Sequence, residues 1–140
     1  MAIRKKLLSA YIDAINNKTS VITDRIGNSL SSGGDNEIII SVLRQNYAIA
    51  YFPDLMLQHV IPESRFSASY LARLNYASSK SWITLLLNYD MCPWGKISTF
   101  TVKLRKLKAW LKLKAWKGPV EYIKWQGACG TFEGLSNLNR

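Results

Sequence analysis

Apolar residues recur three and four positions apart in four stretches of this chain, which is the spacing of one face of an α-helix. The stretches cover residues 2–15, 36–45, 67–91 and 97–116. The apolar positions that define them are Leu7, Leu8, Tyr11, Ile12 and Ile15; Ile38, Ile39, Val42 and Leu43; Leu71, Leu74, Trp82, Leu85 and Leu86; and Phe100, Leu104, Leu107 and Leu111. The pattern predicts four helices, with a Gly- and Ser-rich loop over residues 27–34 between the first two.

Residues typical of helix ends lie at the boundaries of these stretches. Asn16 and Asn17 are expected to end the first helix, and Asn46 follows the second, where a left-handed cap is expected. Ser67 is the expected N-cap of the third helix. Pro119 is expected to stop the fourth.

Two stretches between the second and third helices have the composition of β-strands. Tyr47–Phe52 and Leu55–Ile61 are rich in aromatic, branched and other apolar residues, and Pro53-Asp54 predicts a turn between them. Two strands are too few for an independent sheet. The chain is therefore either a helical protein with a small ribbon, or its strands belong beside others. The fold class predicted is α/β with few strands.

Length and charge restrict the function classes. The chain has 140 residues, which is room for one domain or part of a larger one, and its 48% of hydrophobic residues argues against a wholly disordered chain. Nineteen Lys and Arg residues against nine Asp and Glu residues give a net charge of +10, which predicts anionic surroundings. No uncharged run exceeds nine residues, too few to cross a bilayer, and no signal peptide is expected. The expected location is the cytoplasm.

The positive charge is concentrated in one segment. Residues 96–124 hold nine basic residues and one acid, Glu121. Within this segment, the predicted helix 97–116 combines an apolar stripe with interfacial tryptophans, as do helices that lie on anionic membranes. The residues expected to touch the membrane are Trp110, Trp116, Lys106 and Lys112. In the alternative interpretation, the stripe packs on the preceding helix and the charges are simply solvated.

Single-residue chemistry excludes several kinds of site. Cys92 and Cys129 are not spaced as a CxxC pair and are expected to be reduced thiols. His59, the one histidine, excludes a multi-histidine zinc site made by this chain alone. The sequence contains no glycine-rich nucleotide loop of the GxGxxG or GxxxxGK[ST] type.

Four short motifs occur in a recognisable order. They are Ser-Gly-Gly-Asp-Asn-Glu at 32–37, Asn-Tyr-Ala-Ile-Ala-Tyr-Phe-Pro at 46–53, His-Val-Ile-Pro-Glu-Ser-Arg at 59–65 and Tyr-Leu-Ala-Arg-Leu at 70–74. In order and spacing they resemble the C-terminal half of glycosyltransferase family 2 enzymes, which read Gly-Glu-Asp-x-Glu, a helix, a strand ending in Pro, and a strand carrying His before Pro-x-x-Arg. The resemblance covers about residues 1–75, and Gly34 stands where the family has an acid.

The resemblance implies a fold and a division of the chain. Residues 1–66 would be the acceptor-side, C-terminal portion of a Rossmann-like catalytic domain of the GT-A type, and residues 67–140 a helical, basic extension. The nucleotide-binding half would precede Met1, or would be supplied as a separate chain. The implied activity is transfer of a sugar from a nucleotide-sugar donor to a polysaccharide or lipid-linked acceptor in cell-surface glycan synthesis, at the cytoplasmic face of the inner membrane.

The resemblance also implies roles for individual residues. Asp35 matches the base position, with an ordinary helix-capping aspartate as the alternative. Arg65, Asp24 and Arg25 match segments expected to hold donor phosphate or acceptor, and the alternative for Arg65 is a surface pair with Glu63. His59 would lie near the divalent metal, Mg or Mn, of the complete enzyme, and the alternative is a half-buried structural histidine. This chain alone is expected to hold no cofactor.

A function of a different class stays open. A small non-catalytic basic protein could bind an anionic membrane or nucleic acid with its Lys, Arg, Trp and Tyr side chains. No helix-turn-helix, zinc spacing or aromatic strand motif is present, so nucleic acid is the less favoured partner.

Overall fold

The regular structure of this chain is helical. The computed structural model describes residues 3–17, 30 and 33–136. Within that part the elements are η1 (Lys5–Leu8), α1 (Ser9–Asn16), α2 (Gly34–Arg44), η2 (Glu63–Phe66), α3 (Ala68–Asn88), α4 (Thr99–Leu113) and α5 (Pro119–Ser136). No strand occurs among these residues, so the predicted α/β class, with its Rossmann-like GT-A portion, is wrong.

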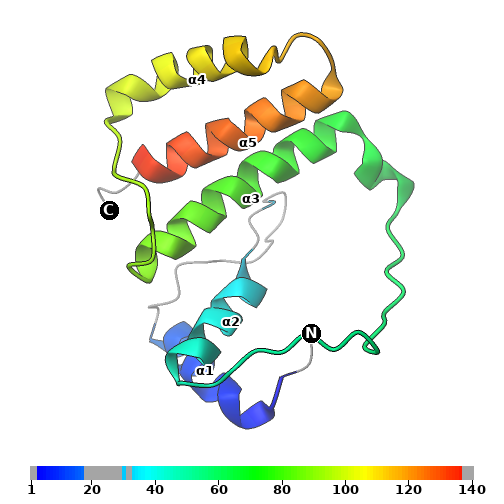
Figure 1. Ribbon diagram of the computed structural model, residues 1–140, viewed down its shortest axis with the longest axis vertical. Helices are drawn as coiled ribbons and strands as arrows, with labels where there is room; N and C mark the ends of the chain where they lie inside the picture. Colours follow the sequence, from blue (N-terminus) through cyan, green and yellow to red (C-terminus); the bar gives the residue numbers. More distant parts are fainter. Residues whose placement is uncertain (1–2, 18–29, 31–32, 137–140) are drawn as a thin grey trace.

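The segment predicted to form two strands is extended but unpaired. Residues 46–62 carry no ladder hydrogen bonds; residues 47–52 lie beside α2, and the chain then runs on as a long connection to η2 (Figure 1). Tyr51, Met56 and Leu57 are 85–89% exposed. The predicted turn is present, since the Leu55 amide donates to the Phe52 carbonyl at 3.1 Å. Composition favours strands here, but a strand also needs a neighbour to hydrogen-bond with, and the described residues provide none.

Three of the four predicted helices are confirmed with small shifts in their bounds. α2 begins two residues early, and Asn46 just after it adopts the expected left-handed conformation, with φ 61°. Ser67 caps α3 as predicted, accepting a hydrogen bond from the Tyr70 amide at 3.3 Å. α4 is shorter than expected at both ends. The first helix is irregular, a 3₁₀ turn followed by eight α-helical residues.

Helix α5 is the element that the sequence pattern missed, and it forms the centre of the fold. Pro119 does not merely stop α4; it is the first residue of α5, a position that suits proline because the first-turn amides have no partner within the helix. Figure 1 shows α5 between α3 and α4, and it packs on both. No helix in the described part of the chain is long and apolar enough to cross a membrane.

A seam of glycines lets α5 and α3 approach closely. A Cβ on Gly127 would lie 2.6 Å from the Asn75 side chain, and one on Gly134 would lie 2.7 Å from the Ile83 side chain. A Cβ on Gly130 would collide with the Tyr76 carbonyl, which is backbone. The α3 residues that face Gly127, Gly130 and Gly134 also follow one another in ascending order, so α3 and α5 run parallel. Helix α4 connects them in the sequence and runs antiparallel to both (Figure 1).

Helix α2 docks on the C-terminal end of α3. Ile40 packs against Leu85 and Tyr89, and the Glu37 side chain is fully buried and accepts a hydrogen bond from the Tyr89 hydroxyl at 3.3 Å. The Arg44 guanidinium lies over the Tyr89 ring and donates to its carbonyl at 3.1 Å. The division predicted between residues 66 and 67 falls at the start of α3, and these α2 contacts cross it.

Candidate functional site

Asp35 lies in the first turn of α2, with its side chain exposed. Gly33 precedes the helix with φ 157° and ψ 0°, a conformation suited to glycine. The Gly33 carbonyl accepts the first helical hydrogen bond, from the Glu37 amide, at 2.9 Å. The helix dipole stabilises a negative charge at this end. The local structure therefore presents one carboxylate to solvent while the neighbouring acid, Glu37, is buried on the inner side.

The other residues predicted to act with Asp35 are not brought beside it. His59 is exposed in the extended segment and Arg65 is exposed in η2. η2 leads into the N-terminal end of α3, whereas α2 packs at the opposite end (Figure 1). A helix of 21 residues is about 30 Å long, so the contacts that Ile40 of α2 makes with Leu85 and Tyr89 lie far from η2. Asp24 and Arg25 lie outside the described residues.

The described residues do not fit a divalent metal. No group of three His, Cys, Asp or Glu side chains that could hold an ion occurs among them. His59 has no carboxylate partner in an ion pair there. The role predicted for His59 near a metal therefore finds no supporting ligands in this part of the chain.

Helix α4 has two apolar faces. Val102 is buried and Ala109 and Leu113 are half-buried, and these three positions lie on the side that packs on α5. The apolar positions singled out from the sequence lie on the opposite side: Phe100, Leu104, Leu107 and Leu111, all exposed. We call these four residues the outer stripe. They are not used for packing within the described structure, so the alternative in which this stripe packs on the preceding helix does not hold.

The four residues predicted to touch a membrane have different surroundings. Lys112 is exposed and Trp116 is 53% exposed just beyond the end of α4. Trp110 is half-buried and contacts the Trp116 ring at a tilt of 46°, with ring centroids 4.7 Å apart. Lys106 points inward, where its ammonium binds the Glu133 carboxylate of α5.

Glu133 is the centre of a polar cluster that joins three helices. Its carboxylate accepts from the Tyr76 hydroxyl and from Lys106, and Lys80 lies 3.7 Å away. Burial alone would raise the pKa of Glu133, but the hydrogen bonds from Lys106 and Tyr76 and the charges of Lys106 and Lys80 lower it below its ordinary value. Burial and the same carboxylate raise the pKa of Tyr76 far above its ordinary value. These interactions join α3, α4 and α5, so the role of the cluster is structural.

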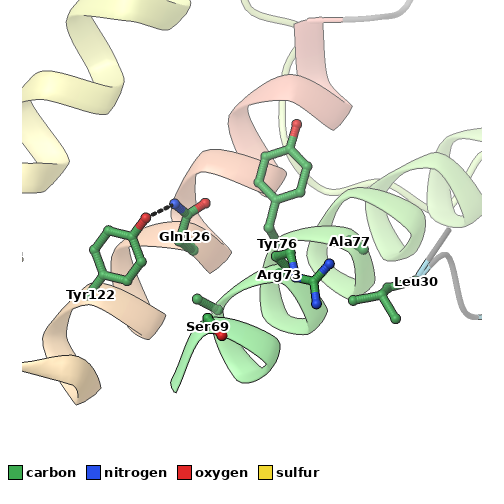
Figure 2. Close-up of a pocket in the computed structure, with 8 residues that line it drawn as sticks. Leu30, Ser69, Arg73, Tyr76, Ala77, Tyr122 and Gln126 are labelled. Atoms are coloured by element: carbon green, nitrogen blue, oxygen red, sulfur yellow. Dashed lines mark hydrogen bonds between the residues drawn. The ribbon is translucent and has the colours of Figure 1, made fainter. Parts of the chain in front are cut away.

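A cleft of about 460 Å³ opens between α3 and α5. Figure 2 shows Arg73 and Tyr76 of α3 facing it from one side, and Tyr122 and Gln126 of α5 from the other, where the Gln126 amide donates to the Tyr122 hydroxyl at 2.9 Å. The Arg73 guanidinium gives it one positive charge, and no carboxylate is among the described residues that line it. The cleft can hold an anionic group against an apolar wall but offers no base.

A second, larger cavity of about 610 Å³ lies beside α2. Its apolar wall comes from Ile38 and Val42 of α2, and its cover comes from residues 47–52 of the extended segment. Asp35, His59 and Arg65, the described residues predicted to carry chemistry, line neither cavity.

Sequence reasoning missed Glu133, Tyr76 and the cleft residues. Arg73 lies within the Tyr-Leu-Ala-Arg-Leu motif, so its position was available as a signal. The role of Glu133 carried no such signal, because α5 lacks the apolar periodicity that would have placed this residue on a helix face.

Comparison with known proteins finds no match for this chain among family models, curated proteins or solved structures.

Proposed function

We propose that this chain takes part in glycosyl transfer, from a nucleotide-sugar donor to a polysaccharide or lipid-linked acceptor in cell-surface glycan synthesis, and that Asp35 is the base. The motifs at 32–37, 46–53, 59–65 and 70–74 supply the resemblance on which the reaction class rests. The observation that supports Asp35 is its exposed position in the first turn of a helix whose inner side is fixed by buried Glu37 and by Ile40.

The chemistry assigned to Asp35 is a single proton transfer. The ionised carboxylate accepts the proton of the acceptor hydroxyl while that oxygen forms its bond to the anomeric carbon. The bond from the anomeric carbon to the donor phosphate oxygen breaks, and the nucleoside diphosphate leaves with that electron pair. The proton remains on Asp35 until solvent removes it, for which the exposed side chain is suited.

The proposal assigns only this part of the reaction to the described residues. The described structure gathers no metal ligands and brings neither Arg65 nor His59 to Asp35, so we derive no step through a metal or through either residue.

Genetic complementation tests the proposal without requiring the chain to work alone. The gene is deleted in the cells that encode it, and the surface glycans are analysed after return of the wild type, Asp35→Asn or Asp13→Asn. Asp13 is an exposed carboxylate on α1 and serves as the matched control. We expect wild type and Asp13→Asn to restore the glycan and Asp35→Asn to fail, with equal helicity and thermal stability for all three. Restoration by Asp35→Asn, or unchanged glycans after deletion, overturns the proposal.

The rival function is that of a non-catalytic basic protein that binds an anionic surface. The exposed outer stripe of α4 favours it, since this feature has no part in the proton transfer. The rival requires that Asp35→Asn be fully functional in the deletion strain, whereas glycosyl transfer requires that it fail.

A further inference from the structure

The outer stripe of α4 is an exposed apolar surface bordered by positively charged side chains. Phe100 is 93% exposed, and Leu104, Leu107 and Leu111 are between 54% and 67% exposed. At 100° per residue, these four side chains fall within a narrow sector of the helix, opposite the sector of Val102, Ala109 and Leu113 that packs on α5. Four large apolar side chains in one exposed row are unusual for a helix that already has a packed face.

Basic side chains flank the outer stripe on both sides. Lys103 borders one edge, and Lys108 and Lys112 border the other, with Arg105 beyond them toward the packed side; Lys114 follows as the C-cap of α4, and all five are exposed. Residues 99–118 contain no Asp or Glu. Lys106, on the inner side, is the only lysine of α4 that forms an ion pair in the described structure.

We propose that α4 docks on an anionic lipid surface, with its axis in the plane of the membrane and the outer stripe between the headgroups. The apolar row enters the boundary of the acyl chains, while the lysines and Arg105 on both flanks contact lipid phosphates. The exposed Trp116 lies at the C-terminal end of the same helix, at headgroup level, where indole rings are favoured. Helices α5 and α3 then lie on the water side.

Charge and shape together select this occupant. A protein partner with an acidic groove would match the flanking charge, but the row of lysines on both edges of an apolar stripe matches a flat surface in which phosphates surround hydrocarbon on every side. Nucleic acid would match the charge and leave the four apolar side chains in water. This inference is independent of the proposed glycosyl transfer, because Asp35 and α2 take no part in it.

Vesicle co-sedimentation of the full chain tests the inference. The vesicles are phosphatidylcholine alone, or phosphatidylcholine with about 30% of the anionic lipid phosphatidylglycerol, which gives the surface a negative potential. The test variant is Phe100→Ser/Leu107→Ser; the matched control is Met56→Ser/Leu57→Ser, which removes two exposed apolar side chains elsewhere. We expect wild type and the control to bind the anionic vesicles, the test variant to bind at least tenfold more weakly, and wild-type binding to persist in part at 0.5 M salt.

Other results overturn it. Equal binding by the test variant and the control removes the outer stripe as the docking surface. Absence of vesicle binding with salt-sensitive binding of a DNA or RNA duplex shows a nucleic-acid protein instead. Circular dichroism of each variant confirms that the exposed substitutions leave the helices intact.

Discussion

Lys106 of α4 and Glu133 of α5 form an ion pair on the inner side of α4, one residue away from Leu107 on its outer stripe. The Glu133 carboxylate also accepts from Tyr76 of α3. One acidic side chain therefore joins all three long helices and fixes how α4 is rotated. That rotation turns the outer stripe away from α5.

Loss of the Glu133 charge should destabilise the protein in a pH-dependent way. Glu133→Gln is expected to reduce the free energy of unfolding by about 1–3 kcal/mol at pH 7, because Lys106 and Tyr76 lose a charged acceptor. Since the pKa of Glu133 is lowered in the folded state, its stabilisation is fully present above its ordinary pKa of about 4.5 and is lost as the pH falls through the folded value. Urea unfolding from pH 7 to pH 3 should show the wild type and Glu133→Gln converging in acid.

The control for this series is Glu63→Gln, which changes an exposed acid in η2. It should stay within about 0.5 kcal/mol of the wild type throughout. A constant difference between Glu133→Gln and the wild type down to pH 3 would show that the cluster does not depend on the charge.

The glycine seam between α5 and α3 predicts a severe effect of one methyl group. Gly130→Ala places a Cβ against the Tyr76 carbonyl, so the helices must separate, at a cost of about 3 kcal/mol. Gly95→Ala adds the same methyl group where no atom lies within 4 Å and should be nearly neutral. Thermal unfolding of both variants measures the difference. Equal melting temperatures would show that α5 does not pack on α3 through Gly130.

Docking of α2 on α3 depends on one fully buried leucine. Leu85→Ala should cost about 2–5 kcal/mol, because it leaves a cavity against Ile40 and Tyr89. Leu43→Ala is the comparison: the Leu43 side chain is 45% exposed on α2, and its loss should reduce the free energy of unfolding by less than about 1 kcal/mol. Amide hydrogen exchange should show α2 losing protection in Leu85→Ala. Unchanged protection of α2 would argue that it is not held by α3.

The two thiols should differ widely in reactivity. Cys129 is buried, and burial together with Glu133 raises its pKa, an effect that Lys106 offsets only in part. Cys92 is half-buried in the loop after α3. At pH 8 we expect iodoacetamide to modify Cys92 quickly and Cys129 only as fast as the protein unfolds. Cys92→Ser should abolish the fast phase; a fast phase that survives in this variant contradicts the burial of Cys129.

Within the described residues, the unpaired segment 46–62 should be cut by a protease before the helices. Brief digestion with chymotrypsin is expected to cut after Tyr51 or Leu57, because the backbone there is exposed and lacks ladder hydrogen bonds. The fragment that contains α3, α4 and α5 should remain intact. Early cuts within those helices, with the segment spared, would favour paired strands over the extended conformation.

The helices that sequence reasoning located are those with a regular apolar period. This period is present in α2, α3 and α4. Ser67 marks the start of α3 through its side-chain cap, and Asn46 marks the end of α2 through its left-handed conformation. α5 was missed because Gly127, Gly130 and Gly134 make its packed side, and glycine contributes nothing to an apolar pattern. Close approach of two backbones stabilises this helix, and only the structure shows that approach.

Two further differences come from tertiary context. The 47–61 segment has strand composition, but pairing depends on a neighbour that local composition cannot supply. The period of α4 identified Leu104 and Leu107 correctly as one face, yet it could not show which side packs, because the inner side is built from Val102, Ala109 and Leu113 with Lys106 among them. Among the candidate site residues, the sequence correctly placed Asp35 at a helix start. It did not reveal that Arg65 lies beside the N-terminal end of α3, whereas α2 packs on the C-terminal end.

The most direct test of the orientation and docking of α4 is the environment of two positions on opposite sides of it. A nitroxide is attached at Leu107→Cys or at Leu113→Cys, in a chain that also carries Cys92→Ser and Cys129→Ala, and its mobility and oxygen accessibility are measured with and without anionic vesicles. The label at position 107 should be mobile in solution and become immobile and oxygen-accessible within the bilayer boundary, while the label at 113 stays immobile in both. A label at 107 that is immobile in solution, or that remains in water on anionic vesicles, would contradict the two-faced helix or its docking, respectively.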